Sequence, residues 1–487
     1  MQDFNALKEL SYKYESLPIY KVIPQDKLSP TETFKILKNI SRHVFILESL
    51  EDEKNTGRYT FLGYNPKLEI SCKDGVLTVK NEKTTDTFSD ACPKEYILQI
   101  INENSSPKFE TLPPFSGGLV GYFSYDFIKY AEKSLKLDGE DVENFKDVDL
   151  MFFDKVIAFD NLKKEIFLII NIATDDFEKS YYKALSELEE MNSLILKGEK
   201  AKIAKLKLTL PFRSLFDEKR YCMMVEKAKH YIKEGDIFQV VLSNRLEADA
   251  EGSLFGTYEI LRKTNPSPYM FYFSSDTVEI AGASPETLVK LSGTKVSTFP
   301  LAGTKPRGKN EKEDRTFEKE LLLDPKELAE HNMLVDLGRN DIGKISRFGS
   351  VKVQKYLSIV RFSHVMHIGS VVESEIMEDK NALDVISAVL PAGTLSGAPK
   401  IRACEIIHEL EGNKRGIYGG AIGYISLTGD MDTCIAIRIA FKKDGKVYVR
   451  SGAGVVADSI PRNEFAECNN KARAIISALK SAAKEVK

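Results

Sequence analysis

The chain has 487 residues, enough for two or three ordinary domains or for one large fold with an extensive core. Hydrophobic residues make up 43% and charged residues 29%, which is typical of a globular protein, and the net charge of -3 gives no general attraction for nucleic acid or an anionic membrane. No apolar run approaches the ~20 residues of a membrane helix. Six scattered cysteines without a C-x-x-C pair indicate free thiols. We expect a cytoplasmic protein that binds neither nucleic acid nor membrane.

Residues 1–200 read mainly as antiparallel β-structure. Apolar and polar residues alternate on both sides of Asp74-Gly75, and the pattern recurs around Asp160-Asn161, so two hairpins are predicted. Helical spacing follows over 177–196. The next stretch, 197–207, is rich in lysine but has no interleaved aromatic residues, which favours a solvated connector over a nucleic-acid patch.

Residues 215–475 form the second predicted region. A helix over 218–234 should end at Gly235, and three further hairpins should turn at 292–294, 428–430 and 443–445. Strands follow strands, with helices interspersed but without a regular alternation of strand and helix. This order indicates an α+β fold with large antiparallel sheets.

Two stretches of small residues are candidates for anion binding. The first, TFPLAGTKPRG at 298–308, should turn through Ala302 and Gly303 and then present two cations, Lys305 and Arg307. The second, PAGTLSGAPK at 391–400, leads into a predicted helix. Neither contains the G-x-x-x-x-G-K-[ST] pattern of a triphosphate-binding loop, so we expect a different anion.

Two predicted helices carry acidic residues. In the first, Asp324 is a suitable N-cap, Glu327 completes a capping box and so has a structural role, and Glu330 lies one turn further on. The second begins near Pro461 and places Glu464, Glu467 and Lys471 on one face, just after Gly452-Ala453-Gly454. Glu330 could be an ordinary solvated carboxylate, but with Glu467 it could also hold Mg²⁺, which accepts one or two protein carboxylates.

Two histidines three residues apart, His364 and His367, form a further candidate. No third soft ligand lies nearby, which argues against zinc. One of them could act in proton transfer or hydrogen bonding, and the spacing alone does not distinguish the two.

Seven motifs occur in the order found in the chorismate-utilising enzymes, and the chain resembles most the anthranilate synthase large subunits among them. They are TFPLAGTKPRG, EHNMLVDLGRNDIGKI, HVMHI, PAGTLSGAPKIRA, IYGGAIGY, CIAIRIA and SGAGVVADSIPRNEFAECNNKARA. The catalytic match covers about residues 215–475, which the resemblance makes a chorismate-binding domain. The resemblance implies a β-sandwich-like core with helices packed outside.

The resemblance also implies an activity: ammonia adds to chorismate and pyruvate is eliminated, giving anthranilate for tryptophan synthesis. Glu330 and Glu467 would be the Mg²⁺ ligands, and His367 and Thr394 would act with them in catalysis. The implied chorismate-binding residues are Gly303, Thr304, Tyr418, Arg438, Gly452, Ala453, Gly454 and Lys471. Arginine on a strand offers a planar fork that suits a carboxylate.

Two positions bear on which relative of this family the chain resembles. Ala302 stands where many aminodeoxychorismate synthases have a nucleophilic lysine, and Gln239 stands where isochorismate- and salicylate-forming relatives have a lysine that activates water. Neither alanine nor a neutral amide performs these reactions, which leaves direct addition of ammonia. Two alternatives stay open: an aminodeoxychorismate synthase component, since not every member needs the lysine, and a catalytically inactive tryptophan-binding regulatory protein.

The N-terminal region resembles a regulatory one. FILESL at 45–50 and NPSPYMFYF at 265–273 resemble the two segments that bind tryptophan as a feedback inhibitor, which implies roles for Ser49, Pro268, Tyr269 and Met270. No cysteine lies in a nucleophile elbow, so no glutaminase domain is expected here. The resemblance implies a separate glutamine amidotransferase subunit that supplies ammonia, within a heterotetramer of two large and two small subunits.

Overall fold

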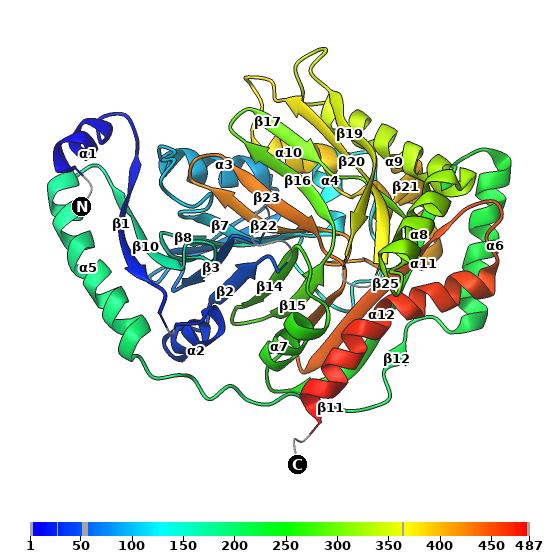
Figure 1. Cartoon of the computed structure of the whole chain (residues 1–487), viewed down its shortest axis with the longest axis horizontal. Coiled ribbons are helices and arrows are strands. Elements are labelled where there is room, and N and C mark those ends of the chain that lie inside the picture. The colour runs from blue at the N-terminus through cyan, green and yellow to red at the C-terminus, as the bar shows by residue number, and fades with distance from the viewer. Residues whose placement is uncertain (1–2, 27, 51–56, 363–364, 485–487) are drawn as a thin grey trace.

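The computed structural model describes residues 3–26, 28–50, 57–362 and 365–484. Two large antiparallel sheets dominate it, and helices surround them (Figure 1). The first sheet has 13 strands, in the order β1 (Ser16–Pro24), β10 (Glu165–Ala173), β9 (Lys155–Asp160), β3 (Tyr59–Tyr64), β2 (Val44–Glu48), β14 (Tyr269–Ser274), β15 (Glu279–Ser284), β24 (Ile439–Lys443), β25 (Lys446–Val455), β13 (Gln239–Glu251) and β11 (Lys207–Leu208), with β12 (Arg213–Ser214) and β21 (Gly397–Ala398) paired to β13.

The second sheet has 12 strands. Their order is β18 (Leu301–Pro306), β20 (Val365–Glu375), β17 (Lys295–Thr298), β16 (Thr287–Ser292), β23 (Met431–Ile435), β22 (Ala421–Ser426), β7 (Gly118–Phe123), β8 (Val148–Phe153), β4 (Leu68–Lys73), β5 (Val76–Lys80) and β6 (Thr85–Phe88), with β19 (Lys352–Arg361) paired to β20. The predicted α+β class with large antiparallel sheets is confirmed.

The local turn signals produced the hairpins that they predict. β4 pairs with β5 around Asp74-Gly75, and β9 pairs with β10 after Asp160. The three predicted hairpins of the second region are also present, as β16–β17, β22–β23 and β24–β25. Gly235 ends its helix as predicted, because its φ of 85° is a left-handed conformation that glycine adopts without steric strain.

Helices cover the outer faces of both sheets. They are α1 (Phe4–Leu10), α2 (Pro30–Ile40), α3 (Pro93–Glu103), α4 (Ile128–Ala131), α5 (Phe177–Lys197), α6 (Glu218–Glu234), α7 (Phe255–Thr264), α8 (Glu311–Leu323), α9 (Pro325–Gly343), α10 (Ala382–Val389), α11 (Lys400–Glu411) and α12 (Pro461–Ala483). α5 runs along the side of β1 and β10, and α12 crosses β25 (Figure 1). The longer helices bury their apolar faces against the sheets, as α5 does against β10 and α12 against β25, which explains the helical spacing in the sequence.

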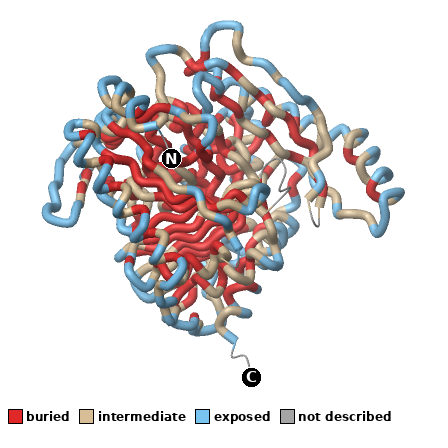
Figure 2. The backbone as a smooth tube through the Cα atoms, turned by 60° about the vertical axis from the view of Figure 1, so that its left-hand side comes forward, coloured by how far each residue is buried: buried red, intermediate tan, exposed pale blue. Residues whose placement is uncertain are grey.

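The core between the sheets is rich in aromatic residues. Phe45 and Phe271 from the first sheet and Tyr122 and Phe153 from the second belong to one buried cluster. Figure 2 shows the buried residues concentrated in the central strands and the exposed ones along the outer helices and loops. This arrangement is the β-sandwich-like core that the family resemblance implies.

Both sheets contain strands from both predicted regions. In the first sheet β2 pairs with β14, and in the second β7 pairs with β22. The two predicted regions, 1–200 and 215–475, thus share both sheets. The assignment of the first as regulatory and the second as catalytic concerns function and stays a prediction.

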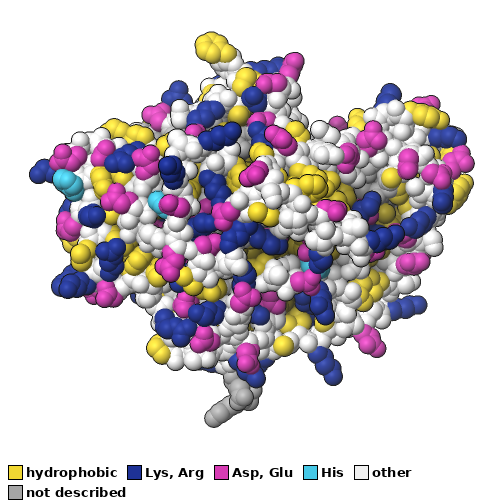
Figure 3. All heavy atoms as spheres, turned by 180° about the vertical axis from the view of Figure 1, so that it is seen from behind, with side chains coloured by type: hydrophobic (Ala, Val, Ile, Leu, Met, Phe, Trp, Pro, Cys, Tyr) yellow, Lys and Arg dark blue, Asp and Glu magenta, His cyan; other side chains and the backbone are white. Residues whose placement is uncertain are grey.

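The apolar character of the helices and the distribution of surface charge can both be compared with what the composition predicts. Among the described helices, none combines the length and apolar character needed to cross a membrane. On the face seen in Figure 3, basic and acidic side chains are interspersed.

Candidate active site

A cavity of about 620 Å³ lies where the ends of β13 and β25 meet β18, β20, α9 and α12. It brings together every residue predicted for catalysis or chorismate binding except Ala453. These residues are Gly303, Thr304, Glu330, His367, Thr394, Tyr418, Arg438, Gly452, Gly454, Glu467 and Lys471. The sequence separations are large, so the cavity is a product of the tertiary fold.

The Ala453 side chain points away from the cavity, because successive side chains along β25 point to opposite faces of the sheet. Its neighbours Gly452 and Gly454 face the cavity, and Ala453 is fully buried in the cluster beneath α6 and α11. A side chain would not fit at Gly452, because a Cβ there would lie 2.8 Å from the Leu242 carbonyl oxygen of β13. The prediction of Ala453 as a binding residue therefore has no side-chain counterpart in the cavity.

One corner of the cavity is acidic. Glu330 on α9 and Glu467 on α12 line it, with Glu327 beside them. Burial raises the pKa of Glu330, the charges of Glu327 and Glu467 raise it further, and Lys326 and Lys471 act in the opposite sense. Glu467 forms an ion pair with Lys471 at 2.7 Å. The corner thus concentrates negative charge that a divalent cation would neutralise.

Glu327 corrects one sequence prediction. Asp324 caps α9 as expected, since its side chain accepts hydrogen bonds from the backbone N–H groups of Lys326 and Glu327. The Glu327 side chain lines the cavity, where a Cβ on Gly303 would lie 2.9 Å from Glu327 Oε2. Its predicted role in a capping box is therefore wrong: the side chain turns toward the cavity and Gly303 leaves room for it.

His367 on β20 is held in place by the neighbouring strand β18. Its Nδ1 donates a hydrogen bond to the Gly303 carbonyl at 2.8 Å and lies 3.1 Å from the Thr304 hydroxyl oxygen. A carbonyl can only accept, so Nδ1 carries the proton and Nε2 of the neutral ring is left with a lone pair. Burial lowers the pKa of His367, the Gly303 carbonyl raises it, and Arg438 lowers it, so the ring is neutral near pH 7. His364 lies outside the described residues.

Arg438 points its charge into the cavity without a carboxylate to match it. Its Nη1 donates to the Lys471 carbonyl at 2.7 Å, and among the described residues it forms no ion pair. Burial lowers its pKa. Its backbone φ of 53° is unusual for a side-chain-bearing residue, and such strain is common at functional sites. An anionic ligand would supply the missing partner.

The residue motifs did not single out Glu286, which lies between β15 and β16 and also faces the cavity. Thr394 donates to its Oε1 at 3.0 Å. Burial raises the pKa of Glu286 to about 7, although the Thr394 hydroxyl and Lys471 both act to lower it. No sequence pattern marked it, because its chemistry comes from burial by segments that are distant in the chain.

The stretch 298–308 departs from its prediction in part. Ala302 and Gly303 do line the cavity, and the strand bulges there, with Gly303 at a φ of 69°. The two cations face elsewhere: Lys305 pairs with Glu320 and Arg307 with Asp314, both on α8. The expectation that they contact the anion is wrong, because α8 supplies their carboxylates. Gln239 lines the cavity as well.

A second, smaller pocket of about 150 Å³ lies between the two sheets. It contains all four residues of the predicted inhibitor site: Ser49, Pro268, Tyr269 and Met270. The pairing of β2 with β14 brings the two segments together. Tyr269 donates to Asp432 at 2.7 Å, and the Ser49 hydroxyl is buried without a hydrogen-bond partner among the described residues.

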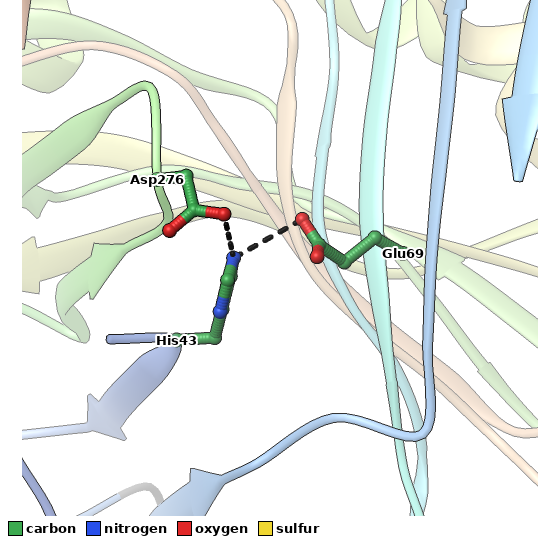
Figure 4. Close-up of side chains that lie close together, drawn as sticks. All are labelled: His43, Glu69 and Asp276. Atoms are coloured by element: carbon green, nitrogen blue, oxygen red, sulfur yellow. Dashed lines mark ion pairs between the residues drawn. The ribbon is translucent and has the colours of Figure 1, made fainter. Parts of the chain in front are cut away.

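A histidine with two carboxylates lies outside both pockets. His43 Nε2 lies 3.1 Å from Glu69 and 3.6 Å from Asp276 (Figure 4). Within the described residues, these three side chains form the group that is spaced closely enough to hold a metal ion. Lys80 already pairs with both carboxylates, at 3.0 and 3.1 Å. Burial alone would raise the pKa of Glu69, but the hydrogen bonds from His43 and Lys80 lower it to about 2. The cluster ties the two sheets together through the ion pairs of Lys80 with both carboxylates.

Comparison with known proteins agrees with this geometry. The family model described as "chorismate binding enzyme" matches residues 43–477. Proteins named "Anthranilate synthase component 1" from Acetivibrio thermocellus and Acinetobacter calcoaceticus are each 42% identical, over 98% of both chains. The crystal structure of anthranilate synthase component I from Streptococcus pneumoniae TIGR4 superposes with a TM-score of 0.75 at 38% identity, covering 93% of this chain and 98% of the other.

Proposed function

The chain belongs to the chorismate binding enzyme family and is an enzyme of lyase type, and from this premise we propose that it aminates chorismate with ammonia and eliminates pyruvate to give anthranilate. The observation that carries the proposal is the convergence in one cavity of Glu330, Glu467, Arg438 and His367. An inactive regulatory protein would have no need to keep these charges together at a cost in stability.

The substrate would be held as a dicarboxylate. The Arg438 guanidinium offers two parallel donors to one carboxylate, and Gly452 and Gly454 bring the backbone of β25 to the cavity wall without side chains of their own. Lys471 adds positive charge at the same wall. Tyr418 lines the same cavity and lies against Gly452, with its hydroxyl oxygen 3.0 Å from where a Cβ would be.

Mg²⁺ would be bound by Glu330 and Glu467. The donor set fits the ion, because hard cations prefer carboxylate oxygens and the acidic corner carries charge that the nearby lysines do not fully offset. When bound, the ion would orient a substrate carboxylate and stabilise negative charge in the reaction.

Two groups are suited to proton transfer. Glu286, with its pKa raised by burial to about 7, can keep a proton near neutral pH and donate it to a departing hydroxyl. His367 is neutral with Nε2 free, which suits it to accept a proton during pyruvate elimination. We assign the acid role to Glu286 and the base role to His367.

Ala302 and Gln239 support ammonia as the nucleophile. Both line the cavity, and neither side chain is nucleophilic or able to act as a base toward water. Ammonia would come from a glutamine amidotransferase subunit, a component 2 to match the name of the relatives, in a heterotetramer. An aminodeoxychorismate synthase is the second candidate.

One assay decides between the candidates. The purified chain is given chorismate, Mg²⁺ and an excess of ammonium salt, and the product is identified. Anthranilate with pyruvate supports the proposal. A product that keeps the enolpyruvyl group indicates the aminodeoxychorismate activity, and no product indicates a regulatory protein. Glutamine in place of ammonium should give no product unless the amidotransferase subunit is added.

The pocket between the sheets would bind L-tryptophan as a feedback inhibitor. Met270 and Tyr269 offer apolar and polarizable surface to an indole ring, and the unpartnered Ser49 hydroxyl can bond the polar end of the ligand. Titration of the ammonium-driven reaction with L-tryptophan tests this directly.

A further inference from the structure

A side cavity of about 50 Å³ lies behind Glu286 and Thr394, and these two residues also line the catalytic cavity. Thr298, Phe299 and Gly338, which are partly exposed, also line the side cavity. The side cavity therefore has the candidate acid in its wall together with partly exposed residues, and those partly exposed residues do not belong to the wall of the catalytic cavity.

The side cavity has the size of a short file of water molecules. A buried water needs about 10–15 Å³ of probe-occupied space, so about three to five would fit. Gly338 of α9 keeps it open: a Cβ there would lie 3.3 Å from Thr298 Cγ2 and 3.5 Å from Pro300 Cγ. A larger side chain at this position would extend into the space between α9 and the β17–β18 connection.

Asp341 gives a separate indication that water is bound. It lines the side cavity and is 5% exposed. Lys400 donates to its Oδ2 at 2.6 Å, but its Oδ1 has no hydrogen-bond partner among the described residues. Buried carboxylate oxygens are almost always hydrogen-bonded, and ordered water is the usual partner where no protein group reaches them.

Glu286 lines both the side cavity and the catalytic cavity. Thr394 donates to one of its oxygens, and no described residue donates to the other. The charged group that acts on Glu286 is Lys471, and those that act on Asp341 are Lys400 and Lys344. A carboxylic acid that protonates a departing hydroxyl becomes a carboxylate and must regain a proton before the next turnover.

We propose that the side cavity holds a file of water molecules that returns a proton from solvent to Glu286 after each turnover, and that Asp341 is the positioning residue that orients this file. In the reaction the C–N bond to ammonia forms as the substrate C–O bond breaks, the Glu286 proton joins the departing hydroxyl, which leaves as water, and the new ammonium group releases a proton to solvent. A solvent proton then passes along the file to the Glu286 carboxylate, with no oxidant or other reactant needed. The inference rests on the proposed function.

The test compares Gly338→Leu, which fills the side cavity, with Gly343→Leu, which lies in the same helix where a Cβ meets nothing within 4 Å. In the ammonium-driven reaction we expect Gly338→Leu to lower kcat about tenfold or more, with the KM for chorismate unchanged. As the pH is raised, the kcat of Gly338→Leu should begin to fall at a lower pH than the kcat of the wild type does. Its solvent deuterium isotope effect on kcat should be larger, because proton return becomes rate-limiting. Gly343→Leu should behave as the wild type.

Two results would overturn the inference: equal kcat, pH profile and isotope effect in the two variants, or a lower kcat in Gly338→Leu with neither the pH profile nor the isotope effect changed. If Gly338→Leu does not fold, Asp341→Asn takes its place, with the same expected changes and the same contradicting results. The wild-type chain separates this inference from the proposed function: absence of anthranilate from the wild type refutes the function, whereas a difference between variants is read only when the wild type is active.

Discussion

The catalytic cavity and the pocket between the sheets differ in how their charges are matched. In the cavity, Arg438 forms no ion pair among the described residues and Glu330 lies near two other carboxylates. In the inter-sheet pocket, Lys290 pairs with Asp432 at 2.9 Å, and aromatic rings make up much of the wall. The cavity thus contains charges that its own residues do not match, whereas the pocket has paired charges and an unpartnered polar atom, the Ser49 hydroxyl, among the described residues.

The two sites come within one residue of each other. Glu286 lines the cavity and its neighbour Thr287 lines the pocket, where the Thr287 hydroxyl lies 3.0 Å from that of Tyr269. A ligand that moves Tyr269 would act on the start of β16 and thereby on Glu286. The comparison therefore predicts that substitutions in the cavity change catalysis, and that substitutions in the pocket change inhibition.

The largest effect is expected for Glu330→Gln. Loss of one of the two carboxylates proposed to bind Mg²⁺ should lower kcat/KM about a thousandfold, or roughly 4 kcal/mol. The fold should persist, because burial and like charges disfavour the ionised form of Glu330. Steady-state kinetics against Mg²⁺ concentration measure this, with exposed Asp336→Asn on the same helix as the control. Activity close to that of the wild type would remove Glu330 from the metal site.

Arg438→Gln should have the next largest effect. Charge-assisted hydrogen bonds contribute about 1.5–3 kcal/mol, so the KM for chorismate should rise about 10- to 100-fold. Arg438→Lys should recover only part of this, because a lysine cannot donate in the parallel geometry of a guanidinium. A KM within twofold of the wild-type value would show that the substrate carboxylate binds elsewhere.

Glu286→Gln should stabilise the protein at high pH. The pKa of Glu286 rises from 4.5 to about 7 on folding, so the folded state binds its proton more tightly than the unfolded state does. Its ionisation lowers the free energy of unfolding progressively between pH 4.5 and 7, by at most roughly 3 kcal/mol. The variant should therefore gain up to this amount at pH 8 and almost nothing at pH 4.5. Urea unfolding at the two pH values measures it.

Exposed Glu378→Gln serves as the control for this measurement, because its side chain is 89% exposed. A gain of equal size at both pH values would mean that the Glu286 carboxyl is not strained by burial. That result would also weaken its assignment as the acid.

The smallest effect concerns the pocket. Ser49→Phe should fill it and raise the L-tryptophan concentration for half-inhibition about tenfold or more, equivalent to 1.4 kcal/mol. Uninhibited kcat should stay the same, since Ser49 does not line the catalytic cavity. Ser49→Ala, which removes only the hydroxyl, should give a smaller shift in the same direction. Unchanged inhibition in Ser49→Phe would place the regulatory site elsewhere.

The sequence by itself determined the local elements. Asp74-Gly75, the left-handed Gly235 and the Asp324 cap act through the conformational preferences of a few adjacent residues, and each produced the predicted turn, helix end or helix start. Ordered motifs also identified eleven cavity-lining residues through family resemblance, because their types and spacing are specific even where their contacts are unknown.

Only the tertiary structure decided which side chains share a space. Ala453 turned away from the cavity because strand pairing fixed which face of β25 is buried, and Glu327 turned toward it because Gly303 leaves room there. Glu286 gained its chemistry from burial between segments more than a hundred residues apart. Such properties depend on long-range packing and the exclusion of water, which no short stretch of sequence encodes.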